Sequence, residues 1–295
     1  MNSPLRFPFV SSIVLALTSF ASADHHGDGA HIETTEVASG LYMLHGVGGF
    51  TGGNIGVSVG DDGVVMIDDS MPPFLDQLQE QLAVITDQPI AFLINTHVHG
   101  DHTGNNAALA KSGARIVAHE RLRSRMKTDP ESSDDGLPVI TFTEEMSFYL
   151  NNQPARLIHT PHAHTDGDSI IVFTAANVIH AGDTFFRGLF PYIDLDSGGS
   201  VDGFIAAQER LLKLSDDQTK IIPGHGPLAS KADLKRDLAM LKDAQKLVAG
   251  FIASDHDIDA ILEANPLAKY HDDYNWGFIT TERMTRTLYR SVAGR

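Results

Sequence analysis

The chain has 295 residues, with 38 acidic residues against 22 lysines and arginines and a formal net charge of −16. This charge repels polyanions, which argues against nucleic-acid substrates or partners, and the absence of cysteine excludes disulfides, thiolate metal ligands and a cysteine nucleophile. The length is ample for a single domain with a large hydrophobic core.

Residues 1–23 have the pattern of a secretory signal peptide. Arg6 supplies the positive charge, a mostly apolar stretch follows, and Ala21-Ser22-Ala23 is a typical cleavage site. The apolar stretch is short for a membrane span, so we favour a cleaved signal over a membrane anchor. Cleavage would leave 21 lysines and arginines against 38 acidic residues, a charge of −17. We therefore expect a soluble periplasmic or secreted protein with no stable membrane insertion.

The mature chain is predicted to begin with a leader and to continue as one domain. Residues 24–36 are polar and rich in histidine, and we expect a flexible leader there. The domain is predicted to span residues 37–295 and to end in a helical segment. Its first elements are strands at 41–47, 55–59, 64–67 and 91–95, with an amphipathic helix at 75–85 before the last of them.

The segment after the fourth strand concentrates metal-binding side chains. It contains His97, His99, Asp101 and His102, so three imidazoles and a carboxylate fall within six positions. Zinc and similar divalent cations prefer these ligands. A loop at the end of a buried strand is also a rigid place for a site. The alternative is a polar loop with fortuitous histidines, and the downstream residues argue against it.

Three further candidate ligands each lie in a Gly- or Pro-containing turn beside a predicted strand. His164 precedes a strand at 169–173, Asp183 follows one at 178–180, and His225 follows one at 220–222. Because loops at the ends of neighbouring strands can converge, we expect these side chains to meet the first group. His162 is an alternative to His164, although the sequence around His164 favours the latter.

The remaining elements repeat the order of strands followed by helix. Strands are expected at 115–118, 146–150 and 155–158, and a short helix at 105–111. Ser200 and Ser230 are predicted to cap two further helices. Strands with helices in both halves of the chain indicate an α/β protein with two packed sheets and helices outside.

These motifs resemble those of the metallo-β-lactamase superfamily, over roughly residues 40–227. The resemblance implies an αββα sandwich with two metal sites. The first would be held by His97, His99 and His164, and the second by Asp101, His102 and His225, with Asp183 bridging them. Asp68 would orient a ligand histidine; a plain turn residue is its alternative. The implied cofactors are two Zn²⁺ ions, and iron or manganese also suits the site.

Such a centre implies a hydrolase that acts on a small molecule. A metal-bridging hydroxide would attack a carbonyl or phosphoryl centre, and Asp101 would orient it and accept its proton. We rank lactams, lactones and esters first. The best-known zinc β-lactamases have a cysteine at the position of Asp183 and a lysine at that of Phe186. Arg187, one position later, is therefore a candidate substrate anchor, with a surface salt bridge as its alternative.

Other functions remain open on the same fold. An aspartate bridge is typical of glyoxalase II, although glutathione thioesters are mainly cytosolic and this chain has a signal for export. A di-iron redox protein would bring a flavin partner domain, of which the sequence has no trace. A non-catalytic zinc-binding protein is disfavoured because a carrier does not need an open bridging position.

Three segments are candidates for shaping a substrate pocket, one of which is the acidic loop 128–138, bounded by proline and glycine. The glycine-rich segment 46–53 carries Phe50 and resembles the mobile flap of zinc β-lactamases; substrate contact and simple packing are equally open for this residue. Residues 266–278 contain four aromatic residues, including Trp276, and we favour their packing onto the sandwich over substrate contact. Oligomeric state is not readable from the sequence.

Overall fold

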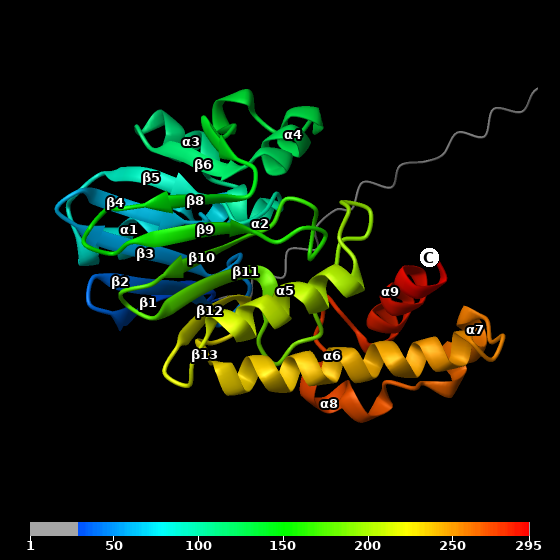
Figure 1. The fold of residues 1–295 in the computed structure, drawn as a ribbon. Helices are drawn as coiled ribbons and strands as arrows, with labels where there is room; N and C mark the ends of the chain where they lie inside the picture. Colours follow the sequence, from blue (N-terminus) through cyan, green and yellow to red (C-terminus); the bar gives the residue numbers. More distant parts are fainter. Residues whose placement is uncertain (1–28, 295) are drawn as a thin grey trace, which may run out of the picture.

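Two β-sheets pack face to face with helices on both outer sides in the computed structural model, which describes residues 29–294 (Figure 1). One sheet has seven strands in the order β1-β2-β3-β4-β5-β6-β7, and the other has six in the order β13-β12-β11-β10-β9-β8. The predicted αββα sandwich is therefore confirmed.

The strands of the first sheet are β1 His31–Ala38, β2 Leu41–Val47, β3 Ile55–Gly60, β4 Gly63–Ile67, β5 Ile90–Ile94, β6 Arg115–His119 and β7 Ile140–Phe142. Those of the second sheet are β8 Glu145–Phe148, β9 Ala155–His159, β10 Ser169–Phe173, β11 Val178–Phe186, β12 Lys220–His225 and β13 Ala229–Ser230. Strands β4 to β7 run parallel to one another, and β11 runs parallel to β12.

The helices beside the first sheet are α1 Leu75–Ile85, α2 Gly100–Thr103, α3 Asn106–Lys111 and α4 Glu120–Thr128. Beside the second sheet lie α5 Val201–Leu214 and α6 Lys231–Ile252, and the chain ends in α7 Ile258–Ala264, α8 His271–Tyr274 and α9 Thr281–Ala293. Helix α6 extends well beyond the sheets, with α7 and α9 beside its far half and α8 below its middle (Figure 1).

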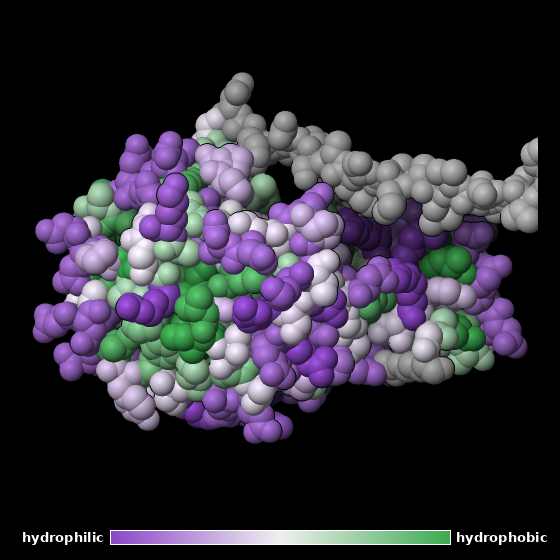
Figure 2. All heavy atoms as spheres, turned by 90° about the horizontal axis from the view of Figure 1, so that it is seen from above, coloured by the Kyte–Doolittle hydropathy of each residue, from purple (hydrophilic) through white to green (hydrophobic). Residues whose placement is uncertain are grey.

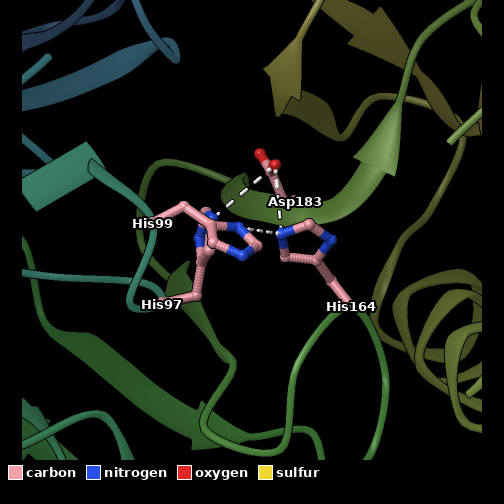
Figure 3. A group of neighbouring side chains, drawn as sticks. All are labelled: His97, His99, His164 and Asp183. Carbon is pink, nitrogen blue, oxygen red and sulfur yellow. Dashed lines mark hydrogen bonds and ion pairs between the residues drawn. The ribbon is translucent and has the colours of Figure 1, made fainter. Parts of the chain in front are cut away.

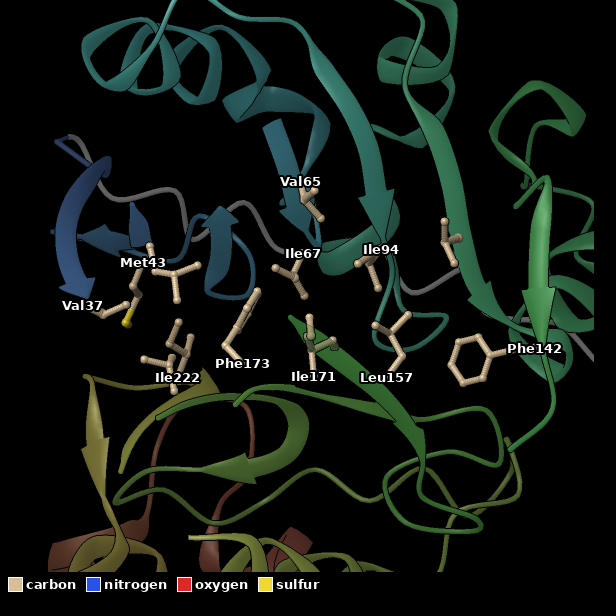
Figure 4. Close-up of a cluster of buried hydrophobic side chains, with 14 residues drawn as sticks. Val37, Met43, Val65, Ile67, Ile94, Phe142, Leu157, Ile171, Phe173 and Ile222 are labelled. Atoms are coloured by element: carbon tan, nitrogen blue, oxygen red, sulfur yellow. The ribbon is translucent and has the colours of Figure 1, made fainter. Parts of the chain in front are cut away.

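Aliphatic side chains fill the space between the sheets (Figure 4). Val65 and Ile67 of β4 lie on one side of this layer, and Ile171 and Phe173 of β10 lie on the other. The intervening β4 residue Met66 packs with the cluster around α1 instead. Both faces of β4 are thus buried, which explains why its sequence reads as a continuous apolar run.

The predicted flexible leader is wrong for its last residues. His31–Ala38 form strand β1, which pairs antiparallel with β2. Ile32 and Val37 are buried, while charged residues and threonines separate them and conceal the alternation expected of a strand. The folded region therefore begins before residue 37. The predicted signal peptide at residues 1–23 and the start of the leader, 24–28, lie outside the described residues.

Two strands are longer than the sequence predicts. β11 continues to Phe186, so Asp183 lies within the strand, and β12 includes His225 at its end. Both predicted caps are confirmed: the hydroxyl of Ser200 accepts a hydrogen bond from Gly203 N, and Ser230 forms a capping box with Asp233. These caps determine where α5 and α6 begin.

Within residues 29–294, no helix combines the length and apolar character needed to cross a membrane. Figure 2 shows one face of the molecule, on which hydrophilic residues occupy much of the rim and hydrophobic residues are grouped within it. Most large apolar side chains of the described residues are buried in the clusters between the layers.

Candidate metal centre

Four side chains converge where β5, β11 and the β9–β10 loop meet (Figure 3). The Nε2 atoms of His97 and His164 lie 3.6 and 3.4 Å from Oδ2 of Asp183. Nδ1 of His99 lies 2.7 Å from Nε2 of His164. The four residues form one group whose ligand atoms are all within 4.8 Å of one another.

A second group lies directly beside the first. Nε2 of His102 is 3.1 Å from Oδ1 of Asp183, and Nε2 of His225 is 3.4 Å from the same oxygen. Asp101 adds its Oδ2, which lies 3.2 Å from Nε2 of His225 and 3.5 Å from Nε2 of His102. All seven ligands predicted from the sequence are therefore brought together.

The donor set fits two metal ions. Tetrahedral ligands about 2.1 Å from a zinc ion lie about 3.4 Å apart, and most of these separations are close to that value. Asp183 directs Oδ2 towards the first group and Oδ1 towards the second. Nε2 of His97 and Oδ1 of Asp183 are also buried without a hydrogen-bond partner among the described residues. Buried ligand atoms that lack a hydrogen-bond partner are satisfied when a cation binds between them.

A shared hydrogen-bond network orients two of the histidines. Oδ2 of Asp68 accepts hydrogen bonds from Nδ1 of His102 and from the Thr96 hydroxyl, both at 2.7 Å. Nδ1 of His97 lies 3.0 Å from the Thr96 hydroxyl oxygen. Each ring therefore presents Nε2 to the centre. Asp68 has the contact predicted for it, and its φ of 62° turns the chain directly after β4.

The other two histidines of the first group are held from the segment between β11 and α5. Nδ1 of His164 donates to the carbonyl of Tyr192 at 2.8 Å, and Nε2 of His99 lies 3.0 Å from Oδ2 of Asp194. His99 thus presents Nδ1 to the centre, whereas the other rings present Nε2. Sequence reasoning missed Asp194, because nothing in its local sequence indicates that a loop thirty residues after His164 folds back onto it.

Burial and neighbouring charges put His97, His164 and Asp183 in the protonation states that bind a metal ion. Burial lowers the pKa of His97 well below its usual value and that of His164 to about 4, so both rings are neutral at pH 7. Burial raises the pKa of Asp183, but the surrounding histidines outweigh it and hold this pKa far below the usual range. Neutral imidazoles beside a carboxylate are the forms that bind divalent cations.

His102 and His225 differ from His97 and His164. Burial lowers the pKa of His102, but the neighbouring carboxylates outweigh it and raise this pKa well above its usual value. Burial also lowers the pKa of His225, but Asp183 and Asp101 together raise it to about 9. Without a cation between them, the ring therefore keeps a proton that it shares with the carboxylates. Metal binding would displace this proton.

Glycine is required where the backbone closes over the centre. A Cβ on Gly53 would collide with the ring of His102, and one on Gly224 would collide with Oδ1 of Asp183. Side chains at these positions would push ligands out of place. The glycine-rich segment before β3 and the turn at the end of β12 therefore pack directly on the site.

Residues 48–225 match the family model described as the metallo-beta-lactamase superfamily. The chain belongs to this superfamily. Its fold is also that of a metallo-beta-lactamase from Pontibacter korlensis, with a TM-score of 0.60 at 17% identity over 72% of this chain and 99% of that one. The DIM-1 metallo-beta-lactamase gives a TM-score of 0.59 at 15% identity, covering 72% of this chain and 98% of its own.

Curated proteins are similar to this chain over shorter stretches. A 2,4-dinitroanisole O-demethylase subunit alpha from a Nocardioides species is 27% identical over 188 residues, 61% of this chain and 55% of that protein. A hydroxyacylglutathione hydrolase from Nitrosococcus oceani is 30% identical over 139 residues, 46% of this chain and 48% of that protein. The matched stretches thus span about half the length of these curated relatives.

Two predicted substrate contacts, Phe50 and Arg187, and the alternative ligand His162 lie around the candidate metal centre. The ring of Phe50 stacks on His225, with centroids 5.7 Å apart. Arg187 donates to the Leu228 carbonyl and pairs with Asp233 at 3.3 Å, so the salt bridge offered as its alternative role exists, and its role as an anchor stays a prediction. Nδ1 of His162 contacts the Gly198 carbonyl outside the ligand groups, which favours His164 as the ligand.

Proposed function

We propose that this protein is a hydrolase with two divalent metal ions, most suitably zinc. The observation that carries the proposal is the carboxylate of Asp183, whose two oxygens each face a separate set of histidines. One carboxylate between two ligand sets is the arrangement expected of a bridged dinuclear centre. His97, His99 and His164 would hold one ion, and Asp101, His102 and His225 the other.

Two bound ions would supply a water activated at neutral pH and would polarise the group under attack. Asp101 is the residue placed to handle the proton. Its side chain is 21% exposed, against 4% for Asp183, so it is the carboxylate of the centre that can reach the substrate side. Burial raises its pKa, but His102 and His225 outweigh this and keep it ionised and ready to accept a proton.

The proposed substrate is a small molecule with a carbonyl centre, with lactams, lactones and esters ranked first. The structural relatives named metallo-beta-lactamases share the fold at low identity. The lysine position of the best-known zinc β-lactamases is taken by Phe186, which is buried and stacks on His225 at 5.1 Å. A substrate carboxylate would therefore need another partner, for which Arg187 is the candidate.

Thioester hydrolysis is the second candidate. Its support is the 30% identity over 139 residues to a protein named hydroxyacylglutathione hydrolase. The proposed export weighs against a glutathione thioester as the natural substrate. The name of the O-demethylase relative adds an aryl methyl ether to the compounds worth testing.

Metal analysis together with a substrate panel tests the proposal. Protein purified without chelator should contain close to two metal ions per chain and should lose hydrolysis when they are removed. The panel should hold a lactam, a lactone, an ester, a thioester and an aryl methyl ether. A reproducible maximum of one ion per chain would refute the dinuclear centre, and thioester hydrolysis far above the others would favour the second candidate.

We also propose that the protein acts in the periplasm or outside the cell, because residues 1–23 have the pattern of a signal peptide. Mass spectrometry of the N-terminus of the exported protein should find Asp24 as its first residue. A mature chain that still begins near Met1 would contradict this.

A further inference from the structure

A cavity of about 390 Å³ adjoins the candidate metal centre at His225. Its walls come from the glycine-rich segment before β3, the turn after β12 and the C-terminal segment between α8 and α9. The largest apolar contributors are Phe50, Leu189, Pro227 and Trp276. A group that enters this cavity therefore lies beside a ligand of the centre.

When His225 is a neutral metal ligand, the cavity presents no charged side chain to such a group. Among residues 29–294, no aspartate, glutamate, lysine or arginine lines it, and His45 and His225 are its titratable members. Asn54 also lines the cavity, but its Nδ2 already donates hydrogen bonds to the carbonyls of Pro223 and Gly226, both at 2.8 Å. A carboxylate or ammonium group entering here would lose its hydration with no charged side chain of the cavity to pair with it. The cavity therefore selects an uncharged group.

Aromatic ring faces border the cavity. The ring of Phe50 is close to parallel to that of His225, at 21°, and the ring of Trp276 is tilted by 35° from His225 with centroids 6.4 Å apart. The indole N–H of Trp276 is used in a 2.9 Å hydrogen bond to the carbonyl of Phe190, which fixes the ring. Trp276 thus offers its apolar body to the cavity. Offset stacking between such faces favours a flat ring over a flexible or puckered chain.

We propose that this cavity binds a flat, uncharged aromatic group of the substrate, with Trp276 and Phe50 as its specificity-determining contacts. The inference rests on the proposed hydrolase function and narrows its substrate class. Trp276 lies beyond residues 48–225, so the part of the chain that matches the superfamily model does not include this wall of the cavity.

Two ester substrates of similar size test whether the cavity prefers a flat ring. Benzyl acetate and cyclohexylmethyl acetate have similar size and similar leaving groups, so a difference in kcat/KM reports on the ring. The metal-loaded full chain should prefer benzyl acetate by about tenfold, the scale expected for stacking on two ring faces. Trp276→Phe should keep most of this preference, whereas Trp276→Leu should reduce it to within about twofold.

The matched control is Phe278→Leu. Phe278 is a 47% exposed aromatic residue that packs on Trp276 at 5.6 Å without lining the cavity, so the preference should be unchanged. Equal kcat/KM values for the two esters in the native chain would overturn the proposal. A preference that persists in Trp276→Leu would also overturn it.

A binding measurement separates this inference from the proposed function. Trp276 is the sole tryptophan of the chain, so its fluorescence reports on the cavity directly. N-benzylacetamide should change this emission in a saturable manner, and N-(cyclohexylmethyl)acetamide should not. If neither these esters nor any compound of the substrate panel is hydrolysed but the emission changes as expected, the hydrolase function fails and the aromatic cavity stands. If the esters are hydrolysed without preference and the emission does not respond, the cavity proposal fails and the hydrolase function stands.

Discussion

At the scale of single residues, the candidate centre depends on which nitrogen each histidine presents. His97, His102 and His164 direct Nε2 inward because Thr96, Asp68 and the Tyr192 carbonyl each engage the opposite nitrogen. His99 is reversed, because Asp194 engages its Nε2. These outer contacts, more than the ligands themselves, preorganise the site before any ion binds.

Replacing Asp194 by asparagine should weaken metal binding at the first group by roughly 10- to 100-fold, because His99 loses its carboxylate partner. Competition with a chelator of known affinity measures the change. The control is Asp196→Asn, because this neighbour is 79% exposed and its side chain pairs with Arg290 outside the site. Equal affinities in the Asp194 variant and the native chain would show that the contact does not position His99.

Replacing Asp101 by asparagine should lower kcat by about 100-fold or more, because an amide is a poor ligand and cannot accept a proton. The fold should persist, since this side chain is partly exposed at the mouth of the site. Steady-state kinetics on the best substrate, together with thermal unfolding, separate the two effects. Native turnover in the folded variant would disprove the role assigned to Asp101.

At the scale of elements, strand β11 connects the core to the chemistry. It is buried along its whole length, and its parallel register with β12 shifts on both sides of Gly182. Gly182 has a φ of 49° and packs against Thr96, so the strand is irregular directly before Asp183. A local irregularity of this kind re-aims a side chain without ending the strand.

Helix α6 provides a test at this scale. Its first turn is closed by the capping box, in which the Ser230 hydroxyl accepts from Asp233 N at 3.3 Å and the Asp233 carboxylate accepts from Ser230 N at 2.9 Å. Ser230→Ala should lower the free energy of unfolding by about 1 kcal/mol in urea denaturation. Ser254→Ala, just past the exposed end of the same helix, is the matched control and should have almost no effect. Equal losses in both variants would contradict the capping role.

At the scale of the whole molecule, the two halves of the sandwich meet in more than the apolar core. His119 at the end of β6 stacks on His159 at the end of β9, with ring centroids 3.7 Å apart and an interplanar angle of 9°. His119 lies 2.8 Å from the Thr143 carbonyl, and Nδ1 of His159 donates to the Asp168 carbonyl at 2.9 Å. Two protonated rings would repel each other here, so the fold favours neutral histidines.

This pair should make stability depend on pH. Burial, reinforced by His119, lowers the pKa of His159 to about 4 from an ordinary value of 6.5. The unfolded chain therefore binds the proton more readily, so the contribution is complete above about pH 6.5 and is lost as the pH falls towards 4. In metal-free protein, the free energy of unfolding should fall when the pH is lowered from 7.5 to 5. This fall should be smaller in His159→Asn than in the native chain, by at most about 2 kcal/mol.

His256→Asn is the control for this measurement, because His256 is exposed at the far end of the molecule beside Phe251. It should leave the pH dependence of the native chain unchanged. An unchanged pH dependence in the His159 variant would show that the stacked pair does not contribute.

The sequence by itself determined the fold class and the seven candidate ligands, because both are written in local patterns. Buried strands read as apolar runs, and the ligands lie in short motifs at strand ends, such as the run from His97 to His102. Only the tertiary structure decided that Asp194 holds His99, that Arg187 pairs with Asp233 and that Trp276 borders the cavity. These contacts join residues 46 to 95 positions apart or distant elements of the fold, and no local periodicity encodes such a pairing. Strand β1 was not predicted from the sequence for a related reason, since its stability comes from pairing with β2 rather than from its own residue pattern.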